Sequence, residues 1–398
     1  FVIKHGENNV FNFQNYLFGD IKISLDYIPY LANEFIPYVI SFLGLTKKCI
    51  VVDLDNTLWG GIVGEDGFDG IRLGPQPPGN AFVEFQKYLK ALSQRGILLA
   101  INSKNNFDDA IQVIREHPFM ILKESDFSCI KINWNNKASN MQEISKELNI
   151  GLDSFVFFDD DPINRELIRE SMPEITTPEL PHDPSFYSEV IQSLHDFSTF
   201  QITSEDTNRG QMYLEQKQRT ESQNSTSDIS EFLKKLNLEI EIKKTNSFTI
   251  PRISQLTLKT NQFNLTTKRY HEDQIKKFSE DKNILIGCAQ IRDKFGDNGI
   301  TGVFIVEKTN YDEWFLDTFL LSCRVMGREA EKAILYFIIN EAKNNNIKRL
   351  KAKFIPTEKN KPIENFLPDC QFYKKDGIWI YNLDKPFNMP DFLTLSEE

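Results

Sequence analysis

Residues 49–61 (CIVVDLDNTLWGG) constrain the fold more than any other stretch, because an apolar run leads directly into two acids and then into glycines. A short run rich in Val and bounded by Gly is typical of a buried central strand in a parallel sheet. In open α/β sheets, ligands bind beyond the carboxyl ends of such strands. Asp53 and Asp55 would repel one another there unless a cation lay between them, and carboxylate oxygens suit Mg²⁺. We therefore expect a metal site at the end of this strand.

Three other interpretations of this stretch differ in strength. A strand that ends in a capped turn explains Asp and Asn through local hydrogen bonds, and the motif alone does not exclude it. An EF-hand loop needs Gly where Leu58 stands. A Walker-type phosphate loop needs a Lys-Ser/Thr ending, which residues 61–67 lack.

Two further apolar runs end in polar clusters. Residues 97–101 precede NSKN, and residues 155–158 precede DDD. Between the three runs, the spacing of apolar residues predicts a helix over residues 81–95, one that ends at His117, and one over residues 137–148. Strands that alternate with helices and deliver polar residues at one end predict a doubly wound parallel sheet with one site.

The side chains expected to converge at this site come from all three strand ends and from one helix. Taken singly, Lys137 would be a solvated helix residue and Ser103 a helix cap. Taken together, carboxylates would bind the metal, a hydroxyl and an ammonium would bind phosphate oxygens, and one acid would act as nucleophile. The set is Asp53, Asp55, Thr57, Ser103, Lys137, Asp159 and Asp160.

This order of acid pair, hydroxyl, lysine and acid pair resembles the haloacid dehalogenase superfamily. Several stretches resemble one of its families more closely, the FkbH-like glyceryl transferase/phosphatases of subfamily IIIC type. They are VDLDNTLWGG (52–61), GEDG (64–67), SKN (103–105), NW (133–134), FDD (158–160), KTNQFNLTT (259–267) and SCRVMGR (322–328). The resemblance extends over nearly the whole chain.

The resemblance implies an enzyme of polyketide biosynthesis. Such an enzyme takes 1,3-bisphosphoglycerate, removes phosphate and loads the glyceryl unit as a thioester onto the phosphopantetheine arm of an acyl carrier protein. By this resemblance Asp53 is the nucleophile and Asp55 the acid/base. The implied phosphate contacts are Thr57, Ser103, Lys104 and Lys137. The implied Mg²⁺ ligands are Asp53, Asp55 and either Asp159 or Asp160. The acyl unit stays open between glyceryl and a relative such as lactyl.

The spacing of these motifs leaves no room for a large cap domain. Asp53 and Ser103 are 50 positions apart, and Ser103 and Lys137 are 34 apart, so that strands and helices take up most of both intervals. Only residues 60–79 remain to form a flap. Because a phosphoryl intermediate must be kept from water, we expect the second domain or a docked carrier protein to cover the site.

Length and composition indicate two domains, since 398 residues exceed one ordinary domain and 40% apolar residues supply two cores. No apolar run approaches the roughly 20 residues needed to span a membrane. Five cysteines without a Cys-x-x-Cys pair argue against a zinc site and for a reducing, cytoplasmic location. A net charge of −11 argues against non-specific nucleic-acid binding. The start at Phe1, without Met or a signal peptide, suggests a piece of a larger polypeptide such as a polyketide synthase.

We expect four regions along the chain. Residues 1–48 form a helical extension packed against the first domain, and residues 49–200 form the haloacid dehalogenase-like phosphatase domain. Residues 201–228 connect it, through a helix start at residues 203–206 and a polar linker, to a second domain at 229–398. In that domain, apolar patterns predict strands near residues 238–242, 301–306 and 313–320.

The second domain resembles an α+β acyltransferase-like (GNAT-like) fold, because a strand, an Arg-x-x-Gly turn and a helix follow one another at residues 313–338. That fold cradles the pyrophosphate of coenzyme A on a helix N-terminus. Glu329 stands where the family usually has Gly or Ala, so a phosphopantetheine arm without the nucleotide becomes the expected ligand. On spacing alone, a closing turn with an exposed Arg pair is an equal alternative.

Despite the negative total charge, acidic carrier helices would need local cations to dock. We expect them to meet either a basic run or an Arg pair. The run is Lys259, Lys268 and Arg269, and the pair is Arg324 and Arg328.

Cys323 lies between a strand end, two arginines and a helix start. Cations and a helix N-terminus stabilise the thiolate that attacks an acyl phosphate, which suggests an acyl-enzyme at this position. The alternative is a buried structural cysteine, the ordinary state of this residue type.

Two functions therefore compete: an acyl-phosphate-consuming transferase, and a Mg²⁺-dependent phosphatase whose second domain only binds a partner. An acyl phosphate is already activated, so thioester formation from it needs no ATP, which favours the first. A binding module without enzyme activity is the third and weakest interpretation, because the composite site counts against it.

Overall fold

The first domain is built on a four-stranded parallel sheet in the order β3-β2-β1-β4. The computed structural model describes residues 1–199, 202–203, 209–224 and 229–398. The strands are β1 (Cys49–Val52), β2 (Leu98–Ser103), β3 (Phe127–Ile132) and β4 (Phe155–Phe158). β1 lies between β2 and β4, with Val52 opposite both Ile101 and Phe158. The predicted doubly wound parallel sheet is confirmed.

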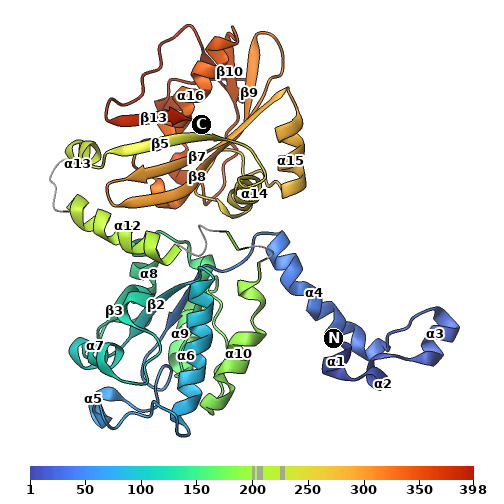
Figure 1. Cartoon of the computed structure of the whole chain (residues 1–398), viewed down its shortest axis with the longest axis vertical. Coiled ribbons are helices and arrows are strands. Elements are labelled where there is room, and N and C mark those ends of the chain that lie inside the picture. Colours follow the sequence, from blue (N-terminus) through green and yellow to red (C-terminus); the bar gives the residue numbers. More distant parts are fainter. Residues whose placement is uncertain (200–201, 204–208, 225–228) are drawn as a thin grey trace.

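Helices cover both faces of this sheet (Figure 1). On one face, Ile50 and Val52 pack with α6 (Gly79–Gln94), α7 (Phe107–Glu116) and α10 (Tyr187–Ser193). On the other face, Val51 packs with α8 (Lys137–Leu148) and α9 (Pro162–Ser171). Residues 60–78 precede α6, contain the single-turn helix α5 (Val63–Asp66) and make up most of the segment expected to form a flap. A short strand that is apolar on both sides therefore sits between two helical layers.

Strand β3 lies between His117 and Lys137, where the sequence pattern predicts no strand. Its sequence FSCIKI mixes polar and apolar residues, and it lies at the edge of the sheet with Ile130 and Lys131 half-buried. A half-exposed edge strand carries a weaker hydrophobic signal than a central one.

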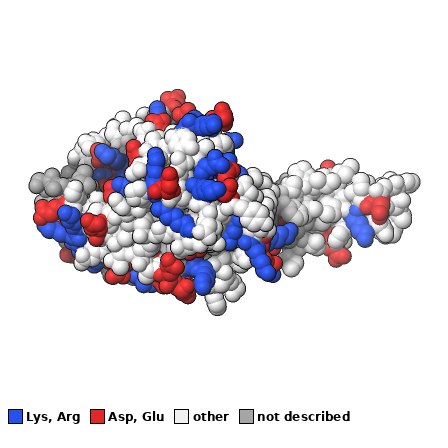
Figure 2. Space-filling model, turned by 90° about the horizontal axis from the view of Figure 1, so that it is seen from above, with Lys and Arg blue, Asp and Glu red and all other residues white. Residues whose placement is uncertain are grey.

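The N-terminal extension is helical as predicted, but it does not pack against the first domain along its length. Its helices are α1 (Val2–His5), α2 (Glu7–Val10), α3 (Phe13–Gly19) and α4 (Ile28–Phe42). α4 buries none of its residues, and Figure 1 shows the extension pointing away from the body. Figure 2 shows it as a largely uncharged projection. The extension therefore has the predicted helices, but not the burial against the first domain that their apolar spacing implied.

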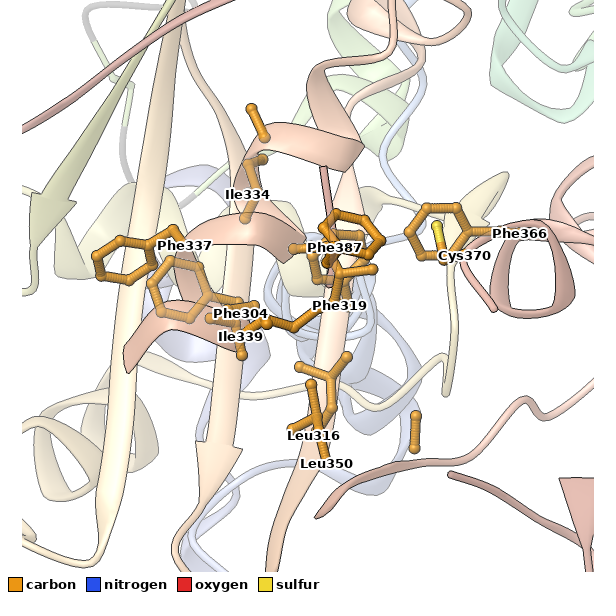
Figure 3. Close-up of a cluster of buried hydrophobic side chains, with 14 of the residues drawn as sticks. Phe304, Leu316, Phe319, Ile334, Phe337, Ile339, Leu350, Phe366, Cys370 and Phe387 are labelled. Carbon is orange, nitrogen blue, oxygen red and sulfur yellow. The ribbon is translucent and has the colours of Figure 1, made fainter. Parts of the chain in front are cut away.

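The second domain is a nine-stranded mixed sheet in the order β11-β12-β10-β9-β8-β7-β5-β13, with β6 paired to β9. Its strands are β5 (Leu238–Lys244), β6 (Phe263–Asn264), β7 (Ile284–Asp293), β8 (Gly296–Glu307), β9 (Glu313–Leu321), β10 (Arg349–Ala352), β11 (Tyr373–Lys375), β12 (Ile378–Asn382) and β13 (Leu393–Glu397). The helices are α13 (Ile229–Lys235), α14 (Ile250–Lys259), α15 (Glu272–Glu280), α16 (Ala330–Asn344) and α17 (Phe366–Asp369). The central helix α16 packs on the sheet, with Ile334 and Phe337 next to Phe304 and Phe319 (Figure 3). This is the predicted α+β architecture.

The connection between the domains is more ordered than the linker expected from its polar sequence. Residues 219–224 belong to helix α12 (Arg209–Asn224). Arg219, 2% exposed, pairs with Asp293 of β7 at 2.7 Å. The helix start expected at residues 203–206 falls largely outside the described residues. No helix in the described part of the chain is long and apolar enough to cross a membrane.

Candidate active site

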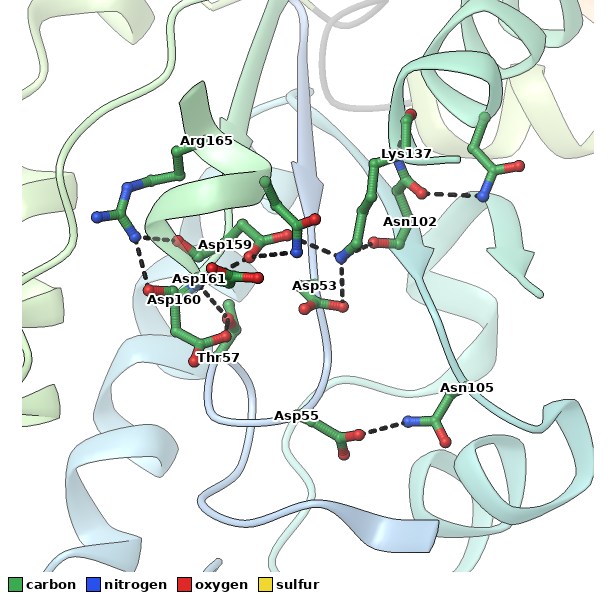
Figure 4. A network of polar contacts seen from close by, with 12 residues as sticks. Asp53, Asp55, Thr57, Asn102, Asn105, Lys137, Asp159, Asp160, Asp161 and Arg165 are labelled. Carbon is green, nitrogen blue, oxygen red and sulfur yellow. Dashed lines mark hydrogen bonds and ion pairs between the residues drawn. The ribbon is translucent and has the colours of Figure 1, made fainter. Parts of the chain in front are cut away.

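Three carboxylates meet at the carboxyl edge of the parallel sheet (Figure 4). Asp53 follows β1, and Asp159 and Asp160 follow β4; one oxygen of each lies within 4.8 Å of the others. β1 and β4 are neighbours, and the Asp53 N–H continues their pairing by donating to the Phe158 carbonyl at 2.9 Å. The ends of two adjacent strands therefore bring these acids together.

Lys137 at the start of α8 inserts its ammonium between two of these acids. Its Nζ lies 2.8 Å from Asp53 Oδ1 and 2.7 Å from Asp159 Oδ2, and it donates to the Asn102 carbonyl at 2.9 Å. The side chain is 1% exposed. Burial acts to lower the pKa of Lys137, but the charges of Asp53 and Asp159 outweigh it and raise that pKa. The buried ammonium therefore stays charged.

The acid cluster fits a divalent cation. Burial, with the charges of Asp53 and Asp159, raises the pKa of Asp160 to about 7. Burial and Asp53 also raise the pKa of Asp159, although Lys137 opposes them. One ammonium thus leaves part of the repulsion uncompensated, and clustered carboxylate oxygens are the ligands that Mg²⁺ takes. Asp53, Asp159 and Asp160 are the side chains that would hold the predicted Mg²⁺, and both members of the doublet belong to the group.

The Asp55 carboxylate is not part of this group. Its Oδ1 accepts from Trp59 Nε1 at 2.8 Å and from the Val63 N–H at 3.1 Å, and its Oδ2 accepts from Asn105 Nδ2 at 2.7 Å. Burial raises the pKa of Asp55, against hydrogen bonds that favour the ionised form. The expectation that the Asp55 side chain binds metal is not met, because its oxygens are turned toward the flap and the loop after β2.

The expected phosphate contacts lie at the same edge, with different exposure. The Thr57 hydroxyl is buried, accepts from the Asp160 N–H at 3.2 Å and lies 3.4 Å from Asp160 Oδ1. Ser103 is the last residue of β2 and is also buried. Lys104 is exposed to solvent. Three of the four expected contacts are therefore inside the site, and Lys104 lies at its rim.

Several supporting residues were not expected from the sequence. Arg165 on α9 is buried and donates from Nη1 to the carbonyls of Asp159 (2.8 Å) and Asp160 (2.7 Å), which fixes the loop that carries both acids. The one sequence feature that could have indicated this role is the position of Arg165 one turn after the Asp-Pro start of α9. The others are Trp59, Asn102 and Asn105, whose partners lie up to 50 positions away.

The second domain contacts the first at the opposite edge of the sheet. Lys48, just before β1, donates to the Lys259 carbonyl at 3.5 Å, and Asn149, before β4, donates to the Cys323 carbonyl at 2.9 Å. Asp153 forms an ion pair with Lys359. All of these residues precede the strands whose far ends carry the acids. The second domain therefore does not cover the carboxylate cluster, contrary to one of the two expectations for water exclusion.

The Arg-x-x-Gly turn does not present both of its arginines to solvent. Arg328 is 6% exposed; its Nη1 lies 3.0 Å from Asp293 and its Nη2 donates to Gln216 at 2.5 Å. Burial, with the charge of Arg219, lowers the pKa of Arg328 to about 10. This side chain ties α12 to the second domain, so it does not meet the expectation of a carrier-facing cation.

The other expected carrier contacts are spread over different environments. Lys268 pairs with the buried carboxylate of Asp317. Arg269 donates to the carbonyls of Thr257 and Thr260 and is half-buried. Lys259 and Arg324 line a cavity between the domains. The residues proposed for carrier docking therefore do not form one continuous basic surface, and Lys259 and Arg324 are the pair that the structure brings near Cys323.

Cys323 lies at this same cavity. It is half-buried in the turn after β9, whereas Cys49, Cys129, Cys288 and Cys370 are buried. The cavity has a volume of about 560 Å³ and is lined from both domains. Of the five cysteines, Cys323 is thus the one that combines partial exposure with a cavity wall.

Comparisons with known proteins give structural neighbours for each half. No protein-family model and no curated protein matches the chain. The N-terminal part of a Bacteroides fragilis protein, containing a phosphatase domain and crystallised with Mg, is 43% identical, with a TM-score of 0.47. The match covers 50% of this chain and 53% of that one, so this chain spans about half the length of that neighbour.

Other structural neighbours include acetyltransferases. The ribosomal-protein-S18-alanine N-acetyltransferase from Escherichia coli is 12% identical over 37% of this chain and 96% of its own, with a TM-score of 0.29. A GNAT-family acetyltransferase from Staphylococcus aureus is 15% identical over 36% of this chain and 99% of its own, with a TM-score of 0.30. Sequence identities and TM-scores this low support no statement about function.

The class of protein follows from the chain's own sheet order and site. A parallel sheet with an acid after β1, a hydroxyl at the end of β2, a lysine opening α8 and acids after β4 is a haloacid dehalogenase-like domain without a large cap. A GNAT-like α+β domain follows it. The two together make a haloacid dehalogenase-like domain joined to a GNAT-like domain.

Proposed function

We propose that this chain is a glyceryl transferase/phosphatase of the FkbH-like type. It takes 1,3-bisphosphoglycerate, removes phosphate and loads the glyceryl unit, or a related hydroxyacyl unit such as lactyl, as a thioester onto an acyl carrier protein in polyketide biosynthesis. The observation that carries the proposal is the presence in one chain of the Asp53–Lys137–Asp159 cluster and a half-buried Cys323 at an interdomain cavity. A phosphatase acting alone would need only the first.

In the phosphatase half, Asp53 attacks the phosphorus of the 3-phosphate, and the bond from phosphorus to the glyceryl oxygen breaks. Water then hydrolyses the aspartyl phosphate and releases inorganic phosphate, while the acyl phosphate stays intact for the transfer step. Lys137 holds Asp53 and Asp159 in place and offers positive charge where phosphate oxygens lie. Mg²⁺ held by Asp53, Asp159 and Asp160 supplies Lewis-acid stabilisation of the transferred phosphoryl group. Asp55 handles the proton, for which its side chain must turn away from Trp59 and Asn105.

In the transferase half, the Cys323 thiolate attacks the acyl phosphate carbonyl. The carbon–oxygen bond breaks, phosphate leaves with the electron pair, and a thioester forms on Cys323. The carrier thiolate then attacks this thioester and releases the Cys323 thiolate. Both steps need no nucleotide, since the acyl phosphate supplies the activation.

The test is to incubate the chain with Mg²⁺, 1,3-bisphosphoglycerate and a phosphopantetheinylated carrier, and to weigh the carrier by mass spectrometry. A glyceryl mass increment that is lost in Cys323→Ala supports the proposal; a normal increment in that variant means that the carrier thiol attacks directly. Phosphate release without any acyl increment would instead support the alternative, a Mg²⁺-dependent phosphatase with a partner-binding second domain.

A further inference from the structure

The cavity between the domains is large enough for more than a three-carbon acyl group. Its volume of about 560 Å³ lies within the range of small-molecule sites. One wall is the loop before β4, which includes Asn149 and Leu152; the other is formed by residues 259–262 and the Cys323 turn. Asn149 joins the two walls through its bond to the Cys323 carbonyl. A ligand here would contact both domains and the thiol at once.

The lining chemistry matches an uncharged, amide-bearing arm with an anionic end. Side-chain amides line it at Asn149, Gln255, Asn261 and Gln262, and these can donate to and accept from ligand amides. Apolar side chains line it at Ile150, Leu152, Leu256 and Pro362. The lining contains five cationic and three acidic residues. This excess of positive charge favours a ligand that carries a phosphate.

The edge of β9, the strand that leads to Cys323, is closed to an extended ligand. β9 pairs with β10 only as far as Leu316, and beyond it the edge of β9 is taken by the chain itself. Asn264 of β6 pairs with Leu320, and the Leu265 N–H donates to the Phe319 carbonyl at 3.1 Å. An extended ligand cannot add to a strand edge whose backbone groups are already paired.

The N-terminus of α16 is also unsuited to a pyrophosphate. Glu329 precedes the helix, and its carboxylate bonds Lys332 at 2.8 Å. Glu331 stands in the first turn and is half-buried, while Arg328 points inward to Asp293. Acids at a helix N-terminus compete with a bound anion for the same partial charge.

We propose that the interdomain cavity binds a 4′-phosphopantetheine arm, with its thiol end at Cys323, and that coenzyme A gains nothing there from its nucleotide. The inference rests on the proposed function for the identity of the arm, and it assigns that arm a place between the domains. Binding at this place should also tie the two domains together.

The experiment measures alkylation of Cys323 by iodoacetamide in the full chain, mapped by peptide mass, in the presence of S-methyl phosphopantetheine or coenzyme A. Ligand at about ten times its Kd leaves roughly a tenth of the sites open, so alkylation should slow about tenfold. Gln262→Trp, which fills the cavity from a half-buried bend, should abolish this protection. Gln192→Trp, on the exposed side of α10, is the matched control and should keep it.

Three results would overturn the proposal: no protection by S-methyl phosphopantetheine, protection that survives Gln262→Trp, or much stronger protection by coenzyme A. Circular dichroism of both Trp variants separates a filled cavity from a lost fold, and the comparison of the two ligands needs no variant. The alkylation experiment contains no acyl donor, so its outcome does not depend on carrier loading. A failure of carrier loading would therefore refute the proposed function without deciding whether the cavity binds the arm.

Discussion

Replacing Lys137 by Met should destabilise the first domain strongly, because the lysine is the cation that compensates two buried acids. Its ammonium lies 2.8 Å from Asp53 and 2.7 Å from Asp159, whose side chains are 12% and 0% exposed. Met keeps most of the side-chain volume and removes only the charge and its hydrogen bonds.

The expected loss is about 3–5 kcal/mol of unfolding free energy in the absence of Mg²⁺, the range for breaking a buried ion pair. Lys131→Met on β3 is the matched control. Lys131 pairs with Glu143 and Glu147, which are 53% and 35% exposed, so its loss should be at most about 1 kcal/mol. Saturating Mg²⁺ at 100 times its Kd would return about 2.7 kcal/mol through binding to the folded state.

The assay is a urea titration in EDTA, followed by hydrogen exchange of peptides that cover β1, so that the first domain is observed apart from the second. The double variant Lys137→Met/Asp159→Asn should be more stable than Lys137→Met alone, since one unpaired charge is gone. A loss for Lys137→Met that is no larger than the loss for Lys131→Met would refute the reasoning.

Three further outcomes are expected. Without carrier, so that Cys323 cannot turn over, Asp53→Asn should abolish multiple-turnover phosphate release in the presence of Mg²⁺, measured as inorganic phosphate, because an amide cannot act as the nucleophile; normal turnover would remove Asp53 from the mechanism. Without Mg²⁺, stability should fall as pH rises from about 4 to 7, because the pKa of folded Asp160 is about 7 and the unfolded acid already loses its proton near 3.8; a thermal-melting series with and without Mg²⁺ checks this, and equal slopes would contradict it. Lys259→Glu should weaken carrier loading and flatten its salt dependence, whereas an unchanged apparent KM for the carrier would place docking elsewhere.

The positions of β1, β2 and β4 could be predicted, because these strands are apolar on both faces. Parallel strands also share one edge for their carboxyl ends, so the acids after β1 and β4 had to meet. The direction of the Asp55 side chain could not be predicted in the same way. It depends on the Trp59 indole and on Asn105, which reaches it across 50 positions of sequence.

Cations were the least predictable part of the chain. Arg328 looks like a surface residue in sequence, and it is buried beside Asp293, an acid 35 positions away along the chain. The spacing of apolar residues predicts which apolar side chains face the core. It does not predict which charged side chain forms a buried ion pair. The same limit applies to α4, whose apolar spacing is regular although none of its side chains is buried.

The placement of the two domains bears on how water is kept from a phosphoryl group on Asp53. The second domain meets residues 48 and 149–154, which precede β1 and β4, while Asp53 and Asp159 follow these strands. A four-residue strand spans about 13 Å, so the second domain does not close the acid site in this arrangement. At that edge, the segment at residues 60–78 contacts the site through the Val63 N–H and Asp55. Of the two expectations for water exclusion, a docked carrier protein is therefore the one that this arrangement leaves open.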